Sequence, residues 1–347
     1  MFTIFAPPAR ILAALSFCLL APIGRADLVW TPAKGWQAEG GVLAPLVSPE
    51  GGGRTALDLM NQASAAEERA DKSTALSLYE RVAKKYPRSE LAGEALYHAA
   101  QLRLDRGQLH SAFENFQAIV AEHPETSHFN QVIGQQYSIA AALVDGTHNR
   151  MFGWIRAPFT NRSQGIEYAE KVLLNAPHSD YAPLTLIKIA QGQEHVGNPE
   201  EAKDALDRLI SNYPQSLLVP DAYLRLAQAY ASDVQGPAYD QGATKQAITY
   251  YEDFTIQFPQ DPNVPSAAKG LADMKTVLAQ GKLEIGDFYL QKRANFTAAR
   301  VLYNEAITTY PNSPVAELAR QRLTEVDTAE AKAKAVGPAR KKFLGLF

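Results

Sequence analysis

The stretch Gly197–Tyr230, GNPEEAKDALDRLISNYPQSLLVPDAYLRLAQAY, predicts two short helices that meet at a tight corner. Gly197 supplies the left-handed residue that ends a preceding helix, and Asn198 is placed to cap the next one. That helix ends at Tyr213, because Pro214 disfavours helical geometry at the residue before it. Alanine and leucine recur at helical spacing on both sides of the corner. Each helix therefore has one apolar face, which needs neighbours of the same kind to be buried.

The same corner recurs along the chain. A residue followed by proline ends a predicted helix at six places, Tyr86-Pro87, His123-Pro124, Ala176-Pro177, Tyr213-Pro214, Phe258-Pro259 and Tyr310-Pro311. The shortest interval between these prolines is close to the ~34 residues of a tetratricopeptide repeat, and the longer intervals indicate insertions. A small residue followed four positions later by an aromatic one, such as Ala75 and Tyr79, lies upstream of most of them. We therefore predict an all-α fold, a tetratricopeptide-repeat α-solenoid of five to six helix pairs over residues 55–326.

Residues 1–26 are predicted to be a signal peptide. Arg10 provides the positive charge and Ile11–Leu20 the apolar core, which is too short to span a bilayer. The chain is thus expected to be exported. The single cysteine, Cys18, lies inside this segment, and bulky Phe17 stands where a lipid-attachment signal requires a small residue. We interpret Cys18 as an apolar filler; the alternative is acylation, which would anchor the chain to a membrane.

Two terminal segments flank the repeats. Residues 27–54 form a Trp/Gly/Pro-rich segment without periodicity, and we expect an extended arm. Because disordered linkers rarely contain two tryptophans, Trp30 and Trp36 indicate an arm that either docks onto a partner or folds back on the first repeat. The basic tail, residues 327–347, is interpreted as frayed, the alternative being contact with anionic lipid or an acidic partner.

Two inserts interrupt the repeats. Residues 145–163 separate the helices of the third unit and include Phe152 and Trp154. This aromatic loop is an interaction site if it is exposed and an ordinary packed loop if it is not. Residues 233–244 are rich in Gly, Pro and Asp and are interpreted as a surface excursion. A longer helix is expected from residue 266 to about 280, leading into the last unit.

The sequence lacks the motifs of known catalytic sites. It contains no phosphate-binding loop, no nucleophile elbow and no histidine pair with zinc-ligand spacing. The histidines are scattered, and acid pairs such as Glu67-Glu68 are interpreted as parts of solvated faces. A formal net charge of −3 argues against a nucleic-acid-binding protein. We predict a binding protein that is not an enzyme and needs no cofactor or metal.

Residues one helical step from the packing positions are expected to line the inner surface formed by the first helix of each pair. In the second unit these are Glu94, Tyr97 and Gln101, and in the fourth they are Ile187, Gln191 and Glu194. A tyrosine among amide and carboxylate groups can hold an extended peptide by stacking and by hydrogen bonds, whereas the alternative is a solvated face. The predicted partner-binding residues are Glu94, Tyr97, Gln101, Phe152, Trp154 and Gln191.

The sequence also resembles a known family. The resemblance is carried by Leu78-Tyr79-Glu80, Tyr86-Pro87-Arg88-Ser89, Ala95-Leu96-Tyr97, Ala176-Pro177-His178-Ser179 and the insert Phe152-Gly153-Trp154. On these residues the chain resembles the BamD family, the tetratricopeptide-repeat component of the outer-membrane β-barrel assembly machinery. The resemblance implies a non-enzymatic scaffold at the periplasmic face of the outer membrane and peripheral to it.

The implied partners are the outer-membrane β-barrel insertion protein, other components of the assembly machinery and unfolded outer-membrane protein segments. The N-terminal units would hold the unfolded segments and the C-terminal units the insertion protein. The alternative is a periplasmic tetratricopeptide-repeat scaffold that coordinates cell-envelope constriction or peptidoglycan synthesis. Such proteins carry a trimerising coiled coil before the repeats, which the glycines and prolines of residues 27–54 cannot form.

Overall fold

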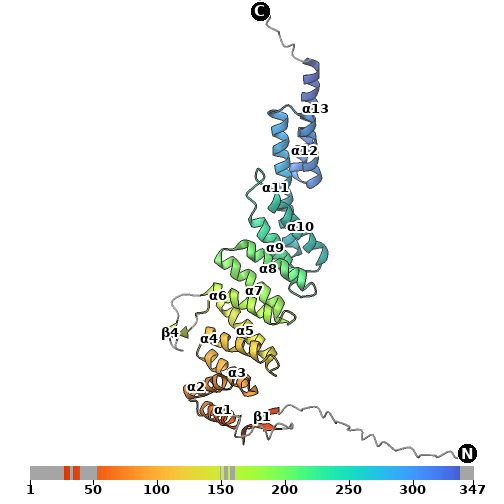
Figure 1. Ribbon diagram of the computed structural model, residues 1–347. Coiled ribbons are helices and arrows are strands. Elements are labelled where there is room, and N and C mark those ends of the chain that lie inside the picture. Colours follow the sequence, from red (N-terminus) through yellow and green to blue (C-terminus); the bar gives the residue numbers. More distant parts are fainter. Residues whose placement is uncertain are drawn as a thin grey trace, which may run out of the picture. The chain divides into compact units, whose positions relative to one another are not determined.

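The computed structural model describes residues 27–31, 34–39, 53–148, 150–151, 155–156 and 161–336, which are mostly helical (Figure 1). The predicted signal peptide with Cys18, the loop residues Phe152 and Trp154, and the end of the predicted tail lie outside the described residues. The helices are α1 (Gly53–Glu68), α2 (Lys72–Lys85), α3 (Glu90–Asp105), α4 (Leu109–Glu122), α5 (Phe129–Val144), α6 (Arg162–Asn175), α7 (Tyr181–Val196), α8 (Pro199–Asn212), α9 (Val219–Ser232), α10 (Gly242–Gln257), α11 (Val264–Gln291), α12 (Phe296–Thr309) and α13 (Pro314–Val336).

The proline corners appear where the sequence predicts them. In each even-numbered helix from α2 to α12, the C-cap residue that follows the last helical residue directly precedes a proline. Tyr86, which ends α2, has φ −129° and ψ 53°, and Tyr213, which ends α8, has nearly the same angles. The Tyr86 N–H still donates to the Val82 carbonyl at 2.9 Å, and the Tyr86 carbonyl accepts from the Ser89 N–H at 3.0 Å. One sequence feature thus produces one recurring turn, which directs each following helix back along its neighbour.

The turns inside the helix pairs use left-handed residues. Gly197 has φ +85°, as its position after α7 predicts. Ala70 and Ala294 adopt the same left-handed geometry at the corresponding places before α2 and α12. Asn198 occupies the N-cap position of α8, but its side-chain Nδ2 donates to Gln193 Oε1 at 3.0 Å instead of capping the helix. The predicted side-chain cap is therefore wrong, because the amide bonds to the preceding helix.

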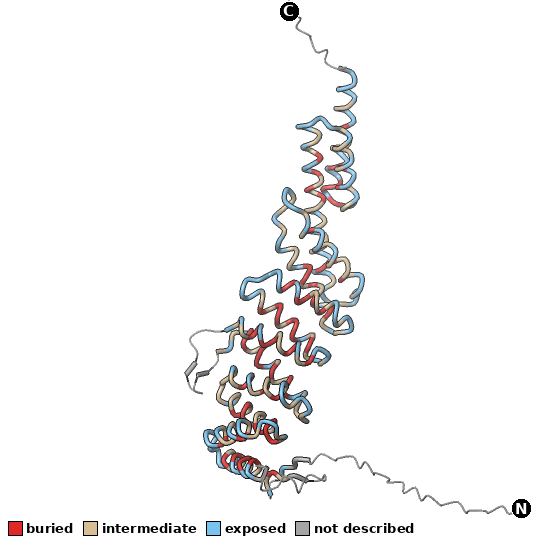
Figure 2. Tube along the Cα trace, in the orientation of Figure 1, coloured by how far each residue is buried: buried red, intermediate tan, exposed pale blue. Residues whose placement is uncertain are grey.

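The chain divides into two compact units. The first comprises the described residues up to Val132 together with residues 150–151 and Ile155, and the second comprises the rest, so that the division falls inside α5. The core of the first unit is formed by α1, α2 and α3 (Figure 2), with large buried side chains that include Met60, Tyr79 and Leu102. Tetratricopeptide helices stack in this way because each one has a single apolar face.

Two cores in the described part of the second unit lie among its last five helices, α9 to α13. One lies between α9, α10 and α11 around Phe254, and the other between α11, α12 and α13 around Tyr303. α11 runs unbroken for 28 residues, so the predicted end near residue 280 is wrong. Gly281 lies inside this helix, where a Cβ atom would approach the Pro237 carbonyl oxygen to 2.6 Å. The insert at residues 233–244 therefore packs against α11 at Pro237, whereas Asp233, Tyr239 and Asp240 in it are exposed.

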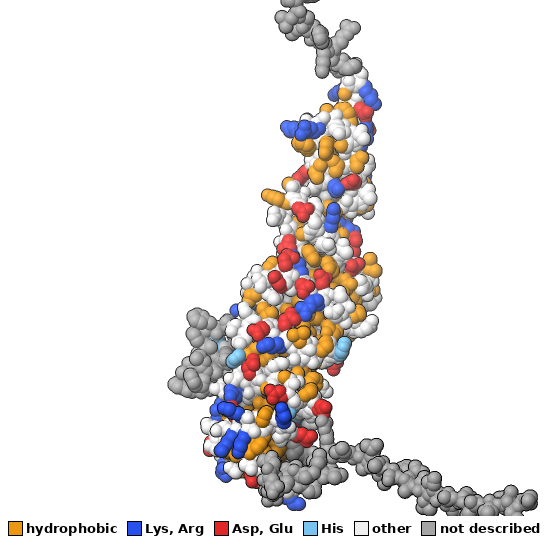
Figure 3. Space-filling view, viewed as in Figure 1, with side chains coloured by type: hydrophobic (Ala, Val, Ile, Leu, Met, Phe, Trp, Pro, Cys, Tyr) orange, Lys and Arg blue, Asp and Glu red, His pale blue; other side chains and the backbone are white. Residues whose placement is uncertain are grey.

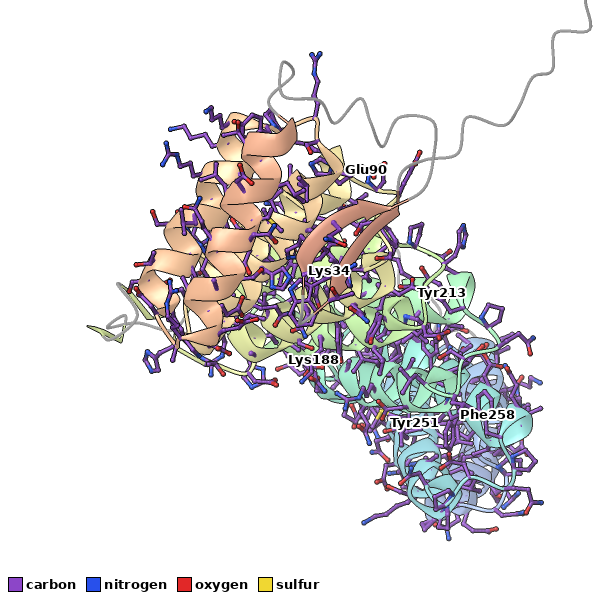
Figure 4. The ribbon with its side chains drawn as sticks, turned by 90° about the horizontal axis from the view of Figure 1, so that it is seen from below. Lys34, Glu90, Lys188, Tyr213, Tyr251 and Phe258 are labelled. Atoms are coloured by element: carbon purple, nitrogen blue, oxygen red, sulfur yellow. The ribbon has the colours of Figure 1, made fainter. Side chains whose placement is uncertain are left out.

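The segment predicted as an extended arm contains a β-hairpin. β1 (Asp27–Thr31) pairs antiparallel with β2 (Gly35–Glu39), and Trp30 stands opposite Trp36. Gly35 follows the turn with φ +67°. β2 packs against α1, and Figure 4 shows the hairpin, with Lys34 in its turn, over the helices of the first unit. Trp36 is 9% exposed, so this part of the arm folds back on the first repeat. A second short ladder, β3 (Arg150–Met151) with β4 (Ile155–Arg156), lies in the third-unit insert.

Candidate functional site

Five ring side chains follow one another across the first unit. They are Trp36 on β2, Tyr79 on α2, Tyr97 and His98 on α3, and His128 just before α5, and we call them the aromatic ladder. The His98 ring stacks on Tyr79 at 4.9 Å between centroids and meets the edges of Trp36 at 6.0 Å and Tyr97 at 6.2 Å. Tyr97 in turn stacks on His128 at 4.3 Å. Contacts of this kind hold rings in fixed orientations.

Polar groups fix the far end of the ladder. The Tyr97 hydroxyl donates to Gln131 Oε1 at 3.1 Å, and His128 Nδ1 lies 2.9 Å from the same oxygen. His128 Nε2 is 3.2 Å from the Glu94 carboxylate, whose side chain is only 14% exposed. Tyr97 itself is half-buried, and Phe116 of α4 meets it from behind at 6.2 Å. Of the predicted groove residues, Glu94 and Tyr97 are thus brought together around one histidine.

Glu67 of α1 anchors the near end of the ladder. Its Oε2 accepts a hydrogen bond from the buried Tyr79 hydroxyl at 2.8 Å and lies 3.5 Å from His98 Nδ1. The hydrogen bond with His98 and that from Tyr79 lower the pKa of the Glu67 carboxyl, against an opposing effect of burial. Burial, together with the neighbouring Glu67 carboxylate, raises the pKa of the Tyr79 hydroxyl. The interpretation of Glu67 as part of a solvated face is therefore wrong, because its carboxylate belongs to a half-buried hydrogen-bond network with Tyr79 and His98.

Trp36 joins the same network from the hairpin. Its indole Nε1–H donates to Ser64 Oγ at 3.1 Å, and Ser64 Oγ lies 3.3 Å from the Tyr79 hydroxyl. Since Tyr79 donates to Glu67, its oxygen is free to accept from Ser64, and Ser64 accepts from Trp36. The donors thus point in one direction, from the indole to the Glu67 carboxylate, and linked hydrogen bonds of this kind strengthen one another.

The remaining predicted site residues lie apart or outside the described part. Gln101 is half-buried on α3, beyond Tyr97 in the first unit. Gln191 is half-buried on α7, which belongs to the second unit. Ile187 on α7 is buried. The predictions for Phe152 and Trp154 fall outside the described residues and stay predictions.

Sequence reasoning missed the histidines and acids that the structure pairs. Glu94 and His128 are 34 residues apart, and Glu67 and His98 are 31 apart, both near one repeat period. An acid and a histidine separated by one repeat lie at neighbouring places on, or just before, successive first helices. That spacing is a signal that could have identified both pairs. No comparable signal identified Ser64, whose role depends on the hairpin.

The described residues contain no group of three or more His, Cys, Asp or Glu side chains that could hold a metal ion. In the same part of the chain, none of the helices has the length and apolar character needed to cross a bilayer. Figure 3 shows Lys and Arg side chains gathered on the first unit near α2, where Arg81, Lys84 and Lys85 are exposed. Of the ladder rings, Tyr97, His98 and His128 are half-buried, whereas Trp36 and Tyr79 are buried.

Comparison with known proteins places the chain in a family. The sequence model of the YfiO family, described as outer membrane lipoprotein, matches residues 159–334, just over half of the chain. The chain belongs to the YfiO family. In this YfiO-family protein a tetratricopeptide repeat model also matches residues 59–89 and 94–126, which cover the first two helix pairs. The predicted all-α tetratricopeptide-repeat fold and the resemblance to the BamD family are thereby confirmed.

The YfiO-family chain has several curated relatives named outer membrane protein assembly factor BamD. The relative from Xylella fastidiosa (strain Temecula1) is 22% identical over 157 residues, covering 42% of this chain and 53% of the relative. Those from Pasteurella multocida and Rickettsia prowazekii are 25% and 26% identical, covering 52% and 45% of this chain and 75% and 61% of the relatives. The chain thus spans about half the length of the Xylella relative.

Solved structures of tetratricopeptide repeat proteins are also similar to the YfiO-family chain. One is the C-terminal part of a repeat protein from Cytophaga hutchinsonii, 17% identical, which covers 75% of this chain and 85% of that one with a TM-score of 0.34.

Proposed function

We propose that this protein is a non-enzymatic scaffold in the assembly of β-barrel proteins into the outer membrane. The observation that carries the proposal is the YfiO family match together with the curated relatives named outer membrane protein assembly factor. The protein would act as an exported chain at the periplasmic face of the outer membrane, peripheral to the bilayer. Its work would be binding: it would hold an unfolded barrel segment and a partner of the assembly machinery.

The aromatic ladder is the proposed site for the unfolded segment. Transmembrane β-strands alternate apolar and polar residues and carry aromatic girdles at both ends. The Tyr97 ring and the Gln101 amide lie one turn apart on α3, so they can meet alternate groups of such an extended strand. Glu94 would fix Tyr97 in place through His128, which is 3.2 Å from its carboxylate. Gln191, Phe152 and Trp154 are proposed as further contacts.

The C-terminal helices are the proposed site for the barrel-insertion partner. α11 exposes Ile285 and Phe288, which lie three residues apart and hence on one face, and α12 exposes Val301. Arg293 lies over the Phe288 ring at 5.5 Å, so the apolar face has a cationic rim. Exposed large apolar side chains bordered by charge are typical of protein interfaces.

The proposal is tested with a strand peptide. A fluorescein-labelled ten-residue peptide with the sequence of a transmembrane β-strand, carrying one aromatic residue at each end, is titrated with the chain lacking its predicted signal. We expect the double variant Tyr97→Ala, Gln101→Ala to bind at least ten-fold more weakly than the wild type. Tyr239→Ala removes another exposed tyrosine, from the loop before α10, and serves as the matched control. Equal affinity for the double variant and the wild type would show that the strand binds elsewhere.

A further inference from the structure

The first repeat holds the backbone of β2 in the manner of a bound peptide. The Trp36 N–H donates to Asn61 Oδ1 at 2.7 Å, and Asn61 Nδ2 donates to the Trp36 carbonyl oxygen at 3.3 Å. One amide side chain thus bonds to both the backbone N–H and the carbonyl group of residue 36. Such a contact recognises an extended backbone and does not depend on the side chain of the bound residue. Gly35 lies so close that a Cβ atom would come within 2.6 Å of Asn61 Oδ1. The contact therefore fits a glycine followed by the residue whose backbone is bound.

The side chain of Trp36 lies in a site formed by residues of the repeats. Asn61 and Ser64 lie three residues apart on α1, so they face the same side of the helix. Ser64 Oγ accepts the indole N–H of Trp36, and the His98 ring of α3 meets the indole edge-on at 87°. We call Asn61, Ser64, Tyr79 and His98 the tryptophan seat. All four residues belong to the repeats, and only the occupant comes from the hairpin.

The two tryptophans of the hairpin differ in their exposure. Trp30 stands opposite Trp36 in the hairpin register but is 43% exposed, whereas Trp36 is 9% exposed. Of the two strands, β2 is the one that packs extensively on α1. The hairpin thus binds one tryptophan to the repeats, through its backbone and its indole, and leaves the other partly exposed.

We propose that the tryptophan seat is a peptide-binding subsite that β2 occupies in cis, and that it takes in trans an extended segment bearing a tryptophan. The seat adjoins the Tyr97 surface, because His98 contacts both the Trp36 and Tyr97 rings. A segment bound along Tyr97 and extended past His98 would reach the seat and replace β2 there. The inference rests on the proposed function in one respect, namely that the competing segment is an aromatic transmembrane strand.

The test uses the chain from residue 27 onward and a fluorescein-labelled peptide with the sequence of residues 27–39, followed by fluorescence anisotropy. Trp36→Ala removes the indole that Ser64 and His98 contact and so weakens the hold of β2 on the seat, and this variant is expected to bind the peptide at least ten-fold more tightly than the wild type. Trp30→Ala is the matched control and should bind as weakly as the wild type. Adding Asn61→Ala to Trp36→Ala should abolish the gain. A gain that persists in this double variant, or equal binding by the wild type and Trp36→Ala, overturns the proposal.

A second variant keeps the proposal testable if Trp36→Ala does not fold. Trp36→Phe keeps a ring in the seat but removes the indole N–H that Ser64 accepts, so it should bind the peptide with an affinity between those of the wild type and Trp36→Ala. Circular dichroism establishes that each variant has the helical content of the wild type. If Trp36→Ala does not fold, a Trp36→Phe variant that folds and binds no more peptide than the wild type overturns the proposal.

A competing peptide separates this inference from the proposed function. The strand peptide, with tryptophan as one of its two terminal aromatic residues, is added to the complex of Trp36→Ala with the hairpin peptide, and a version with this tryptophan replaced by alanine is added in parallel. Displacement by the first and not by the second is expected. If the hairpin peptide binds the seat but the strand peptide does not displace it, the seat stands as a subsite, and the assignment of barrel strands as its ligand is refuted.

Discussion

Removing one hydroxyl group from Tyr79 should weaken the first unit selectively. Tyr79 is completely buried, and its hydroxyl is shared between the Glu67 carboxylate and Ser64. Tyr79→Phe keeps the ring and its stacking on His98 but leaves Ser64 without its acceptor and Glu67 without one of its donors. Since the ring volume hardly changes, no cavity contributes to the effect.

The magnitude follows from the type of hydrogen bond that is lost. A hydrogen bond to a charged group contributes about 1.5–3 kcal/mol to stability. The Glu67 side chain is 37% exposed, so water can replace part of the lost interaction, and we expect a cost of about 2 kcal/mol, near the lower half of that range. This corresponds to a loss of about 30-fold in the equilibrium between closed and open forms of α1 and α2.

Hydrogen exchange resolved by peptide is the suitable assay, because it reports the opening of each helix separately. Peptides from α1 and α2 should exchange about 30-fold faster in Tyr79→Phe. The matched control is Tyr303→Phe. Tyr303 is also completely buried and donates to a carboxylate of the preceding helix, Asp287 Oδ1, at 2.7 Å. It should speed exchange in α11 and α12 and leave α1 and α2 unchanged.

Two results would refute this reasoning. Unchanged exchange of α1 and α2 in Tyr79→Phe would mean that the hydroxyl contributes nothing to the stability of the first unit. Equal acceleration of both units by either substitution would mean that the effect spreads through the chain and does not come from the local hydrogen bonds.

Further predictions concern the left-handed turn residues, the loss of stability at acid pH and α11. Gly197→Ala should cost about 1–2 kcal/mol, because φ is +85° while the new Cβ meets nothing within 4 Å, and Ala70→Gly should gain about 1 kcal/mol, since φ is +61°; urea unfolding measures both. The pKa of Glu67 is lowered in the fold, mainly by His98 and then by Tyr79 and Lys72. The stability that the Glu67 carboxylate gives to the fold is therefore fully present above pH 4.5, the ordinary pKa of the group. This stability is lost as the pH falls below 4.5 and through the lowered pKa. Glu67→Gln should remove this acid-dependent loss, as measured by the tryptophan fluorescence midpoint in urea from about pH 3 to 7, and an unchanged slope would contradict it. Gly281→Ala should destabilise the second unit by about 1–3 kcal/mol, because its Cβ would lie 2.6 Å from the Pro237 oxygen, and faster exchange in α11 with no change in α1 would be the expected signature.

The repeats could be predicted because their signals are local. A proline after each second helix acts on the residue before it, and the structure places every one of the six predicted corners at a helix end. Tyr97 could be placed near a surface of the first unit, because helical periodicity fixes its direction relative to the apolar face. Each of these inferences needs only residues within one or two turns.

The sequence-based predictions fail where the local structure depends on residues that are far apart in the sequence. α11 continues through Gly281, which lies against Pro237 of the loop before α10, and no local rule relates two residues 44 positions apart. The hairpin was missed because its stability depends on Trp36 entering a place built by three helices of the repeats. Glu67 was assigned to solvent for the same reason, since its partners Tyr79 and His98 come from two other helices.

The most direct test of the central claim is photo-crosslinking from the ladder in living cells. A photoreactive phenylalanine analogue is placed at position 97 of the exported chain, and at position 239 as the control, and the captured proteins are identified by mass spectrometry. A scaffold for barrel assembly predicts precursors of outer-membrane β-barrel proteins at position 97 and their absence at position 239. Capture of cell-wall synthases or division proteins at position 97, without any barrel protein, would contradict the account.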